Sequence, residues 1–435
     1  MQVPFTKTTL ANGLQVIVHE DHRVPLVAVS LWYHVGSKNE QPGLTGLAHL
    51  FEHLMFEGSE HQPDGYFGPL QEAGAALNGS TSTDRTNYWE LVPREAWRLA
   101  LWMEADRMGW LLPALSQARL DTQRGVVLNE RRQSYENRPY GLAQFALMAA
   151  MFPPAHPYHW PTIGEPADLE AATLDDVTAF FRRYYHPGNA SLAVVGDVAT
   201  DAVLREVEHL FGAIPAGPHV ARVQPPGADG SSARLVLEDR VELPRLYLGW
   251  RTPGLFAPGD AELDLVGDLV ANGRTSRLYK RLIHDRRIAA ELAAGQTSRE
   301  LGGTFQIIAS AAPGHTLDEL EQAIHEELAR FAEEGPSDEE VNRGRVQAEA
   351  AFVFRVQSLG GFGGKADQLN AYNVHRQAPD SFDADLGRYL GATRETLRDA
   401  AARWLVPSRA AVLGVVPLGR ADGALPDARV LDRAS

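Results

Sequence analysis

The first half of the chain opens with two runs of mostly apolar residues that read as strands. Residues 13–19 and 25–35 are short apolar runs that are typical of strands, and a loop separates them from a helical pattern over residues 45–57. Proline and glycine precede that pattern and Gly58 follows it, and these residues favour the start and the stop of a helix. The pattern predicts a unit of two strands and a helix.

The second half begins in the same way. Residues 235–237 and 244–250 read as strands, and a helical pattern that starts at Ala261 stops at Asn272 and Gly273. The order of the predicted elements is therefore the same at the start of both halves.

Each half also closes alike, with a helix that leads to a proline and an apolar strand. Pro25 precedes Pro187 by 162 residues, and Pro244 precedes Pro407 by 163 residues. Such closely matched spacings indicate an internal duplication. Between the halves, residues 215–232 are rich in Pro, Gly and small residues, which is the composition of a linker.

We therefore predict an N-terminal domain over residues 1–214, a linker over residues 215–232 and a related C-terminal domain over residues 233–435. Strands and helices are mixed rather than strictly alternating, which favours an α+β fold. The predicted architecture is two related α/β sandwich domains, each with helices packed on a mostly antiparallel sheet. A chain of 435 residues is long enough for two hydrophobic cores.

Composition narrows the functional class. The formal net charge of −15 argues against a nucleic acid as partner, because proteins that bind nucleic acids usually carry basic patches. No apolar run approaches the roughly 18 residues of a spanning helix, so we expect a soluble protein without a membrane span. We also expect no signal peptide, and the compartment stays open between a bacterial-type cytoplasm and periplasm. With no cysteine, a transition-metal site must be built from His and carboxylates.

The helix predicted over residues 45–57 carries a candidate metal site. At about 100° per residue its apolar side chains share one face, and His49, Glu52 and His53 cluster on the opposite side. The two imidazoles are one turn apart and can reach one ion, and Glu52 can hold the water at the metal without being a ligand. For any one of these residues an exposed polar face is the simpler interpretation. The three together form the H-x-x-E-H motif of inverted zincins, which is uncommon by chance.

Two histidines leave a catalytic zinc ion one protein ligand short. A second helix, predicted over residues 116–136, contains Glu130, with 76 residues between it and His53. An H-x-x-E-H string followed by a glutamate at about that distance resembles the pitrilysin, or M16, family of zinc endopeptidases. The resemblance covers nearly the whole chain and is greatest to the half-length members, which include bacterial peptidases and the mitochondrial processing peptidase. It continues through the segments ANGLQVIV, LNGSTSTDRTNYWELVP, HPYHWPTIG and YYHPGNASLAVVGDV.

The resemblance implies that His49, His53 and Glu130 bind one zinc ion per chain and that Glu52 is the general base. Two neutral imidazoles and one carboxylate leave the site net positive, which favours acidification of the attacking water. Glu52 would take the proton of that water and deliver it to the leaving amine. The substrate would be a peptide or an unfolded protein.

One departure from the family pattern lies on the second helix. Family members commonly carry a glutamate seven residues before the ligand glutamate, where this chain has Gln123. Asp121 does not replace it, because it lies about 180° around the helix from Glu130. Gln123 could still hydrogen-bond to a metal ligand, without the negative charge of a glutamate.

A second departure lies in the second half. The duplication aligns Asp264, Gly267 and Asp268 with the three motif residues of the first half, so the second half has no metal triad. Active family members also use an Arg and a Tyr of a C-terminal-type domain to hold substrate and stabilise the oxyanion, and the corresponding positions here are Ile283 and Ala290. The resemblance therefore implies a heterodimer in which a related subunit supplies Arg and Tyr, with a homodimer as the alternative.

Three other features have their own interpretations. The stretch GGFGGK at residues 360–365 fails the Walker pattern at both ends, so we interpret it as a flexible, glycine-rich loop. His156 and His159 lie in a loop set by prolines, and we expect them to have structural roles. The strand after Asn78, over residues 86–91, could offer an edge to an extended substrate that binds near Asn78.

Two functional hypotheses follow. The first is a zinc metalloendopeptidase that hydrolyses internal bonds of unfolded peptides, as the zinc-bearing subunit of a two-subunit peptidase. The second is a metal-bearing assembly subunit with little turnover of its own, which Gln123 and the missing Arg and Tyr permit. Retention of Glu52 beside both histidines favours the enzyme.

Overall fold

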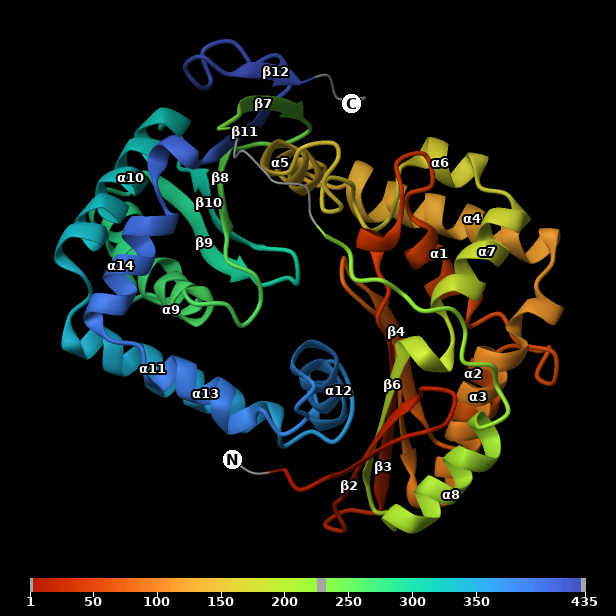
Figure 1. The fold of residues 1–435 in the computed structure, drawn as a ribbon. Helices are drawn as coiled ribbons and strands as arrows, with labels where there is room; N and C mark the ends of the chain where they lie inside the picture. The colour runs from red at the N-terminus through yellow and green to blue at the C-terminus, as the bar shows by residue number, and fades with distance from the viewer. Residues whose placement is uncertain (1–2, 225–231, 432–435) are drawn as a thin grey trace. The chain divides into compact units, whose positions relative to one another are not determined.

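The first six strands of the chain form one mixed sheet, shown in the computed structural model of Figure 1, which describes residues 3–224 and 232–431. The strands β3 and β6 lie at its centre and are buried along nearly their whole length, as their continuous apolar sequences favour. β2 pairs with β6 in parallel, and the other neighbours are antiparallel. The strands are β1 (Thr6–Thr9), β2 (Gln15–Glu20), β3 (Leu26–Tyr33), β4 (Ala76–Thr81), β5 (Thr86–Pro93) and β6 (Ala190–Gly196), in the sheet order β1-β2-β6-β3-β5-β4.

The second half repeats this topology. When β7, β8 and β11 are matched with β2, β3 and β6, the two sheets have the same neighbours, and the parallel pair β7 and β11 takes the place of β2 and β6. The outer strand differs, because β1 is antiparallel to β2 whereas β12 is parallel to β7. The predicted duplication and the predicted α+β class are therefore confirmed. The strands are β7 (Arg234–Asp239), β8 (Arg245–Thr252), β9 (Ala289–Thr297), β10 (Gly303–Ala311), β11 (Ala411–Pro417) and β12 (Arg429–Leu431), in the sheet order β12-β7-β11-β8-β10-β9.

Helices cover both sheets. The first metal-site helix is shorter than predicted, and the second continues into a π-helical turn, Arg132–Glu136. Within the described residues, no helix combines the length and the apolar character that crossing a bilayer requires. The helices are α1 (Leu47–Leu54), α2 (Phe67–Glu72), α3 (Trp97–Ala114), α4 (Gln117–Arg131), α5 (Ala143–Met151), α6 (Pro166–Ala171), α7 (Leu174–Tyr184), α8 (Thr200–Phe211), α9 (Asp260–Ala271), α10 (Leu317–Glu334), α11 (Asp338–Arg355), α12 (Lys365–Arg376), α13 (Phe382–Leu390) and α14 (Arg394–Trp404).

The chain forms two compact units, each with one sheet, and each unit includes a segment from the other half of the chain. Unit 1 contains α12 from the second half, and unit 2 contains α5 from the first half. No pattern in the sequence predicts this exchange. The predicted boundary stays a prediction, and residues 225–231 of the predicted linker lie outside the described part of the chain. Unit 1 is Met1–Glu130, Trp160–Val223 and Ala351–Ala384, and unit 2 is Arg131–His159, Gln224–Ala350 and Asp385–Ser435.

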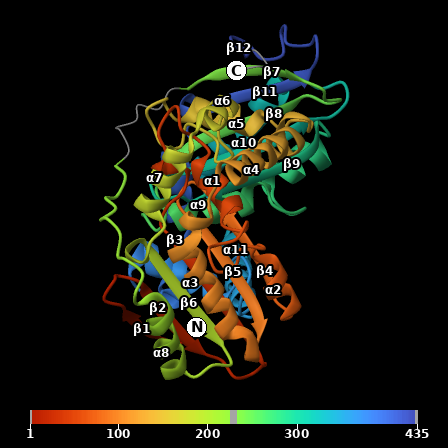
Figure 2. The ribbon, with the colours of Figure 1, turned by 90° about the vertical axis from the view of Figure 1, so that its right-hand side faces the viewer.

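The exchanged helix α12 covers one face of the unit 1 sheet, and α3 and α8 cover the other, where Figure 2 shows them in front of the strands. Buried polar side chains hold α12 in place. Asn370 Nδ2 donates to the Ser30 backbone oxygen at 2.8 Å, and Asn370 Oδ1 accepts from Ser191 Oγ at 2.8 Å. Asp367 Oδ1 accepts from Trp32 Nε1 at 2.7 Å. Because buried polar groups need partners, these bonds fix the position of α12 along the sheet.

The exchanged helix α5 packs on β8 and β11 in unit 2 through apolar side chains. Leu147 and Met151 belong to one buried cluster with Leu413. Gly249 of β8 allows the close approach, since a Cβ there would lie 2.7 Å from Met151 Sδ. Each unit thus obtains part of its interior from the other half of the chain.

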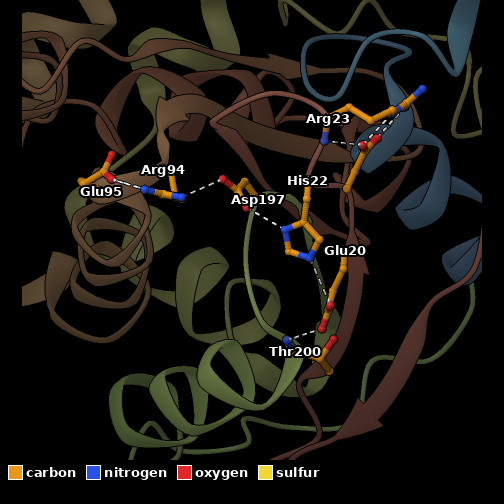
Figure 3. A network of polar contacts seen from close by, with 8 residues as sticks. Glu20, His22, Arg23, Arg94, Glu95, Asp197 and Thr200 are labelled. Carbon is orange, nitrogen blue, oxygen red and sulfur yellow. Dashed lines mark hydrogen bonds and ion pairs between the residues drawn. The ribbon is translucent and has the colours of Figure 1, made fainter.

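A surface network joins the ends of β2, β5 and β6 in unit 1 (Figure 3). His22 Nδ1 lies 2.6 Å from Asp197 Oδ1, and Arg94 Nη1 donates to Asp197 Oδ2 at 3.2 Å. Glu20 Oε1 accepts from the Thr200 backbone N–H at 2.6 Å at the start of α8. The His22 side chain is 58% exposed, so solvent screens the network and we expect it to orient the strand ends rather than to stabilise the sheet greatly.

Candidate metal centre

The helix α1 is positioned by its first turn. Gly46 precedes it with a φ of +88°, and a Cβ there would lie 2.8 Å from the Gly164 Cα, so only glycine fits without strain. The buried carboxylate of Glu40 accepts hydrogen bonds from the backbone N–H groups of Gly46 at 2.9 Å and Ala48 at 2.8 Å. These bonds satisfy amides at a helix end that have no partner within the helix. Burial raises the pKa of Glu40 to about 8, although the two amides oppose this.

The apolar face of α1 fixes its rotation. Leu50, Phe51 and Leu54 are buried, and the Phe51 ring stacks on Phe180 of α7 with 5.8 Å between the ring centroids. With that face in the core, the three polar residues of the motif point away from it and are half-buried, as the helical period predicts.

Three donor atoms converge beside α1. Glu130 of α4 places its Oε2 3.3 Å from His53 Nε2 and 3.7 Å from His49 Nε2, and the donor atoms of all three residues lie within 4.8 Å of one another. Tetrahedral ligands at 2.0–2.1 Å from a zinc ion lie about 3.4 Å apart, so these atoms fit zinc with little movement. The structure therefore brings together the three residues that the sequence analysis selected as ligands.

The ionisation of these groups suits a cation. Burial and the nearby His53 lower the pKa of His49 to about 4, and the hydrogen bond with His53 lowers the pKa of Glu130. At neutral pH His49 is thus neutral and Glu130 is ionised, which is the state in which each can bind a metal. His49 Nδ1 is buried without a hydrogen-bond partner among the described residues, whereas His49 Nε2 faces Glu130. The nitrogen that points to the centre is therefore Nε2.

Glu52 lies on the same side of α1 but outside the group of three donors. Burial raises its pKa, and a hydrogen bond with Thr81 and the charge of His53 oppose the rise. Thr81 is the last residue of β4, so the Glu52 carboxylate lies where α1 meets the end of that strand. A carboxylate with a raised pKa beside a metal site is suited to accept and return a proton.

The strand β4 is one of the two edge strands of the unit 1 sheet, and β1 is the other. The prediction of an edge at the strand over residues 86–91 was wrong, because β5 lies between β3 and β4. Asn78 is an exposed residue of β4, and its Oδ1 accepts a hydrogen bond from the Gly79 backbone N–H at 2.8 Å. The strand to which an extended chain could pair is therefore the one that carries Asn78.

Gln123 is buried on α4, and its Nε2 donates to Glu57 Oε1 at 2.6 Å. In the described residues this bond joins Gln123 to a carboxylate just beyond α1 rather than to one of the three donors. Asp121 pairs instead with Arg124 Nη1, on another side of α4. A contact between Gln123 and a metal ligand stays a prediction.

The remaining histidine and lysine candidates have structural partners. His156 is fully buried, and its Nδ1 accepts from the Tyr158 backbone N–H at 3.0 Å, while His159 Nδ1 lies 2.6 Å from a backbone oxygen. The glycine-rich stretch leads into α12, where Lys365 Nζ donates to Asp21 Oδ2 at 2.8 Å. That lysine belongs to a buried ion pair and is not free for a phosphate.

In unit 2, α9 occupies the place of α1, between β8 and β9. None of its described residues belongs to a group of three metal donors. Asp264 accepts a hydrogen bond from the Tyr389 hydroxyl at 2.6 Å, and burial raises the pKa of Asp264 to about 7.

Two residues near the donor group, Glu40 and Arg85, are absent from the predicted site. Glu40 has no motif, since its role depends on a loop that folds back onto the first turn of α1. Arg85 had a signal that was overlooked, because it is the one basic residue in the segment LNGSTSTDRTNYWELVP.

Comparisons with known proteins identify relatives. Residues 15–156 match the family described as Insulinase (Peptidase family M16), and residues 171–347 match the family described as Peptidase M16 inactive domain. The chain is 30% identical to "Zinc protease PqqE" of Helicobacter pylori over 356 residues, which are 80% of each protein. It is 24% identical to "Uncharacterized zinc protease YmxG" of Bacillus subtilis over 80% of this chain and 84% of that one. A crystal structure of a protease from Helicobacter pylori is similar with a TM-score of 0.88 and 25% identity, and the match covers 96% of this chain and 100% of that chain.

Proposed function

The chain belongs to the M16 peptidase family, and on that premise we propose that it is a zinc metalloendopeptidase that hydrolyses internal bonds of unfolded peptides. The observation that carries the proposal is the convergence of His49, His53 and Glu130 beside Glu52. We assign the first three as ligands of one zinc ion per chain and Glu52 as the general base.

When bound, zinc supplies a Lewis acid that acidifies water and polarises the peptide carbonyl. The protein residues hold the ion and move the proton. Glu52 accepts a proton from the attacking water and returns it to the leaving amine, and burial, which raises its pKa, makes it a better proton acceptor than an exposed carboxylate. Thr81 orients the Glu52 carboxylate from the end of β4.

A substrate in extended conformation can pair with the edge strand β4. A peptide that pairs with it adds a strand to the sheet and passes Asn78 and the end of β4, where Glu52 lies. A folded protein cannot present a strand in this way, so the proposed substrates are peptides or unfolded segments.

We further propose that a related partner subunit completes the active site. The positions that correspond to the family Arg and Tyr are Ile283, in a π-helical turn, and Ala290, in β9. Neither side chain can donate a hydrogen bond to an oxyanion. A heterodimer in which the partner supplies these donors accounts for their absence, and a homodimer is the alternative.

The presence of Gln123, where family members commonly have a glutamate, favours a second function. A metal-bearing assembly subunit with little turnover needs the zinc ligands for stability but does not need the second family glutamate. The presence of Glu52 beside the histidines, although it is not one of the proposed ligands, argues for the enzyme.

The test measures zinc content and cleavage of a fluorogenic peptide for the chain alone and with candidate partner subunits. Glu52→Gln should keep its zinc and lose at least about a thousandfold in kcat, because it removes the base and leaves the ligands. Glu130→Gln should lose zinc affinity by about a hundredfold or more. Asp121→Asn on the same helix is the control and should change neither quantity.

Stoichiometric zinc with no cleavage by the wild type in any pairing would leave the assembly role. Equal cleavage by the wild type and Glu52→Gln would refute the assignment of the base. A chain that binds no zinc would refute both functions.

A further inference from the structure

The side chain of Arg85, in the hairpin between β4 and β5, has polar and aromatic contacts on one side. Its Nη1 donates to the Ser80 backbone oxygen at 2.9 Å and to Ser80 Oγ at 2.5 Å, and its Cζ lies 5.3 Å from the centroid of the Trp32 ring. The side chain is partly buried. Stacking and two hydrogen bonds from one nitrogen leave Nε and Nη2 in a fixed position as a second pair of donors.

The guanidinium has no ion-pair partner among the residues that the structure describes. The charges of Asp367, Glu52 and Asp84 act on it, but each of these carboxylates has other partners. Asp84 pairs with Lys38 Nζ at 3.4 Å. Asp367 accepts from two side chains, one of them Trp32, and from a backbone amide, and Glu52 bonds with Thr81. A partly buried cation without a carboxylate partner is costly, so its position calls for an anionic ligand.

Arg85 and the proposed base meet at the same end of the edge strand. Ser80, which holds the guanidinium, is followed by Thr81, which bonds with Glu52. A peptide paired with β4 would pass this point close to the bond that is cleaved. A carboxylate of that peptide could accept from the two free nitrogens of Arg85 in the bidentate geometry that guanidinium favours.

We propose that Arg85 binds a carboxylate of the peptide substrate and makes the peptidase prefer acidic substrates. This inference rests on the proposed function and adds a substrate class to it. Two sources have the same chemistry, an Asp or Glu side chain within about three residues of the cleaved bond and the free C-terminus of a short peptide. Arg85 is a specificity-determining residue in this scheme and does not act on the reacting bond.

The experiment uses the zinc-loaded protein with its partner subunit if cleavage requires one. Fluorogenic peptides carry a single Glu at successive positions on both sides of the cleaved bond, and each has a matched Gln peptide. A third set has Gln throughout and ends in either a free carboxylate or an amide. The quantity measured is the ratio of kcat/KM between the members of each pair.

For the wild type, the ratio should exceed about tenfold in at least one pair, as expected for a charge-assisted hydrogen bond. Arg85→Gln should reduce that ratio to about one and leave kcat/KM for the uncharged peptide within about threefold. Arg85→Lys keeps the positive charge but cannot form the bidentate pair of a guanidinium, so it should give an intermediate ratio. Arg98→Gln, an exposed arginine paired with Glu206, is the control and should keep the wild-type ratio.

The pair that shows the preference identifies the source of the carboxylate. A wild type that cleaves peptides with no preference in any pair would overturn the inference while the proposed function stands. An equal loss for charged and uncharged peptides in Arg85→Gln, with zinc content and melting temperature unchanged, would also overturn it. Absence of all cleavage by the wild type would instead refute the proposed function, and with it the inference.

Discussion

Glu52 and Glu130 are carboxylates beside the same two histidines, yet their surroundings shift their pKa values in opposite directions. Burial raises the pKa of Glu52, and the hydrogen bond with His53 lowers the pKa of Glu130. A carboxylate whose pKa is lowered is suited to bind a cation, and one whose pKa is raised is suited to accept and return a proton. The residue-scale environment thus separates the two roles without reference to relatives.

Gln123 also contributes to stability, because its Nε2 donates to Glu57 Oε1 at 2.6 Å. Gln123→Glu would place two carboxylates at hydrogen-bond distance in a buried position, and we expect a loss of about 1 to 2 kcal/mol in the free energy of unfolding at pH 7. The double variant Gln123→Glu with Glu57→Gln reverses the bond and should recover most of this loss. Urea unfolding of the two single variants and the double variant measures the coupling, and additive effects would contradict it.

At the scale of the element, α1 depends on a cap that no local motif supplies. Glu40→Ala would leave the amides of Gly46 and Ala48 without their buried acceptor, and we expect a loss of about 1 to 3 kcal/mol in the free energy of unfolding. His49 directly follows Ala48, so fraying of the first turn should also weaken zinc binding. Glu40→Gln keeps one acceptor oxygen and should have the smaller effect. Chelator competition and urea unfolding provide the two readings, and a wild-type result for Glu40→Ala in both would show that α1 does not need the cap.

In α9, the half-buried Asp264 takes the place that His49 has in α1. Because burial raises the pKa of Asp264 from 3.8 to about 7, the folded protein binds a proton there that the unfolded chain releases above about pH 4. The stability from this group is complete below about pH 4 and is lost as the pH rises to about 7. Asp264→Asn keeps an acceptor for Tyr389 and cannot ionise, so relative to the wild type it should gain about 2 to 4 kcal/mol between pH 4 and pH 8.

Urea midpoints of the wild type and Asp264→Asn at pH 5 and pH 8 test this dependence. Asp268→Asn, one turn further along α9, removes a smaller contribution to the raised pKa of Asp264 and should keep most of the wild-type pH dependence. Parallel curves for Asp264→Asn would mean that the carboxylate does not titrate in this range.

For the whole molecule, the periodicity of the sequence was sufficient for the duplicated α+β fold, because strands such as β3 and β6 and the helix α1 have strong local patterns. The three donors could be selected because the motif places two of them on one turn and the resemblance supplies Glu130. The edge position of β4 could not, since strand order depends on contacts between distant segments. The cap by Glu40 and the exchange of α5 and α12 could not be predicted for the same reason, because no local sequence pattern indicates the distant segment that each of them contacts.

The exchange of helices has a consequence for folding. A chain of residues 1–224 lacks α12, so the buried side chains of Ser30, Trp32 and Ser191 lose their partners on that helix, and its own α5 lacks the sheet on which it packs. A chain of residues 232–435 lacks α5, and its own α12 lacks the sheet on which it packs. We expect neither half to show a cooperative melting transition alone, because each would expose apolar strands and unsatisfied polar groups.

Co-expression of the two halves should yield a soluble complex that melts cooperatively, since it differs from the intact chain mainly by the cut between the halves. Circular dichroism and size-exclusion chromatography of each half and of the pair make the comparison. A monomeric, cooperatively melting 1–224 fragment would show that α12 is dispensable for the first sheet, and the close packing of its buried amides argues that it is not.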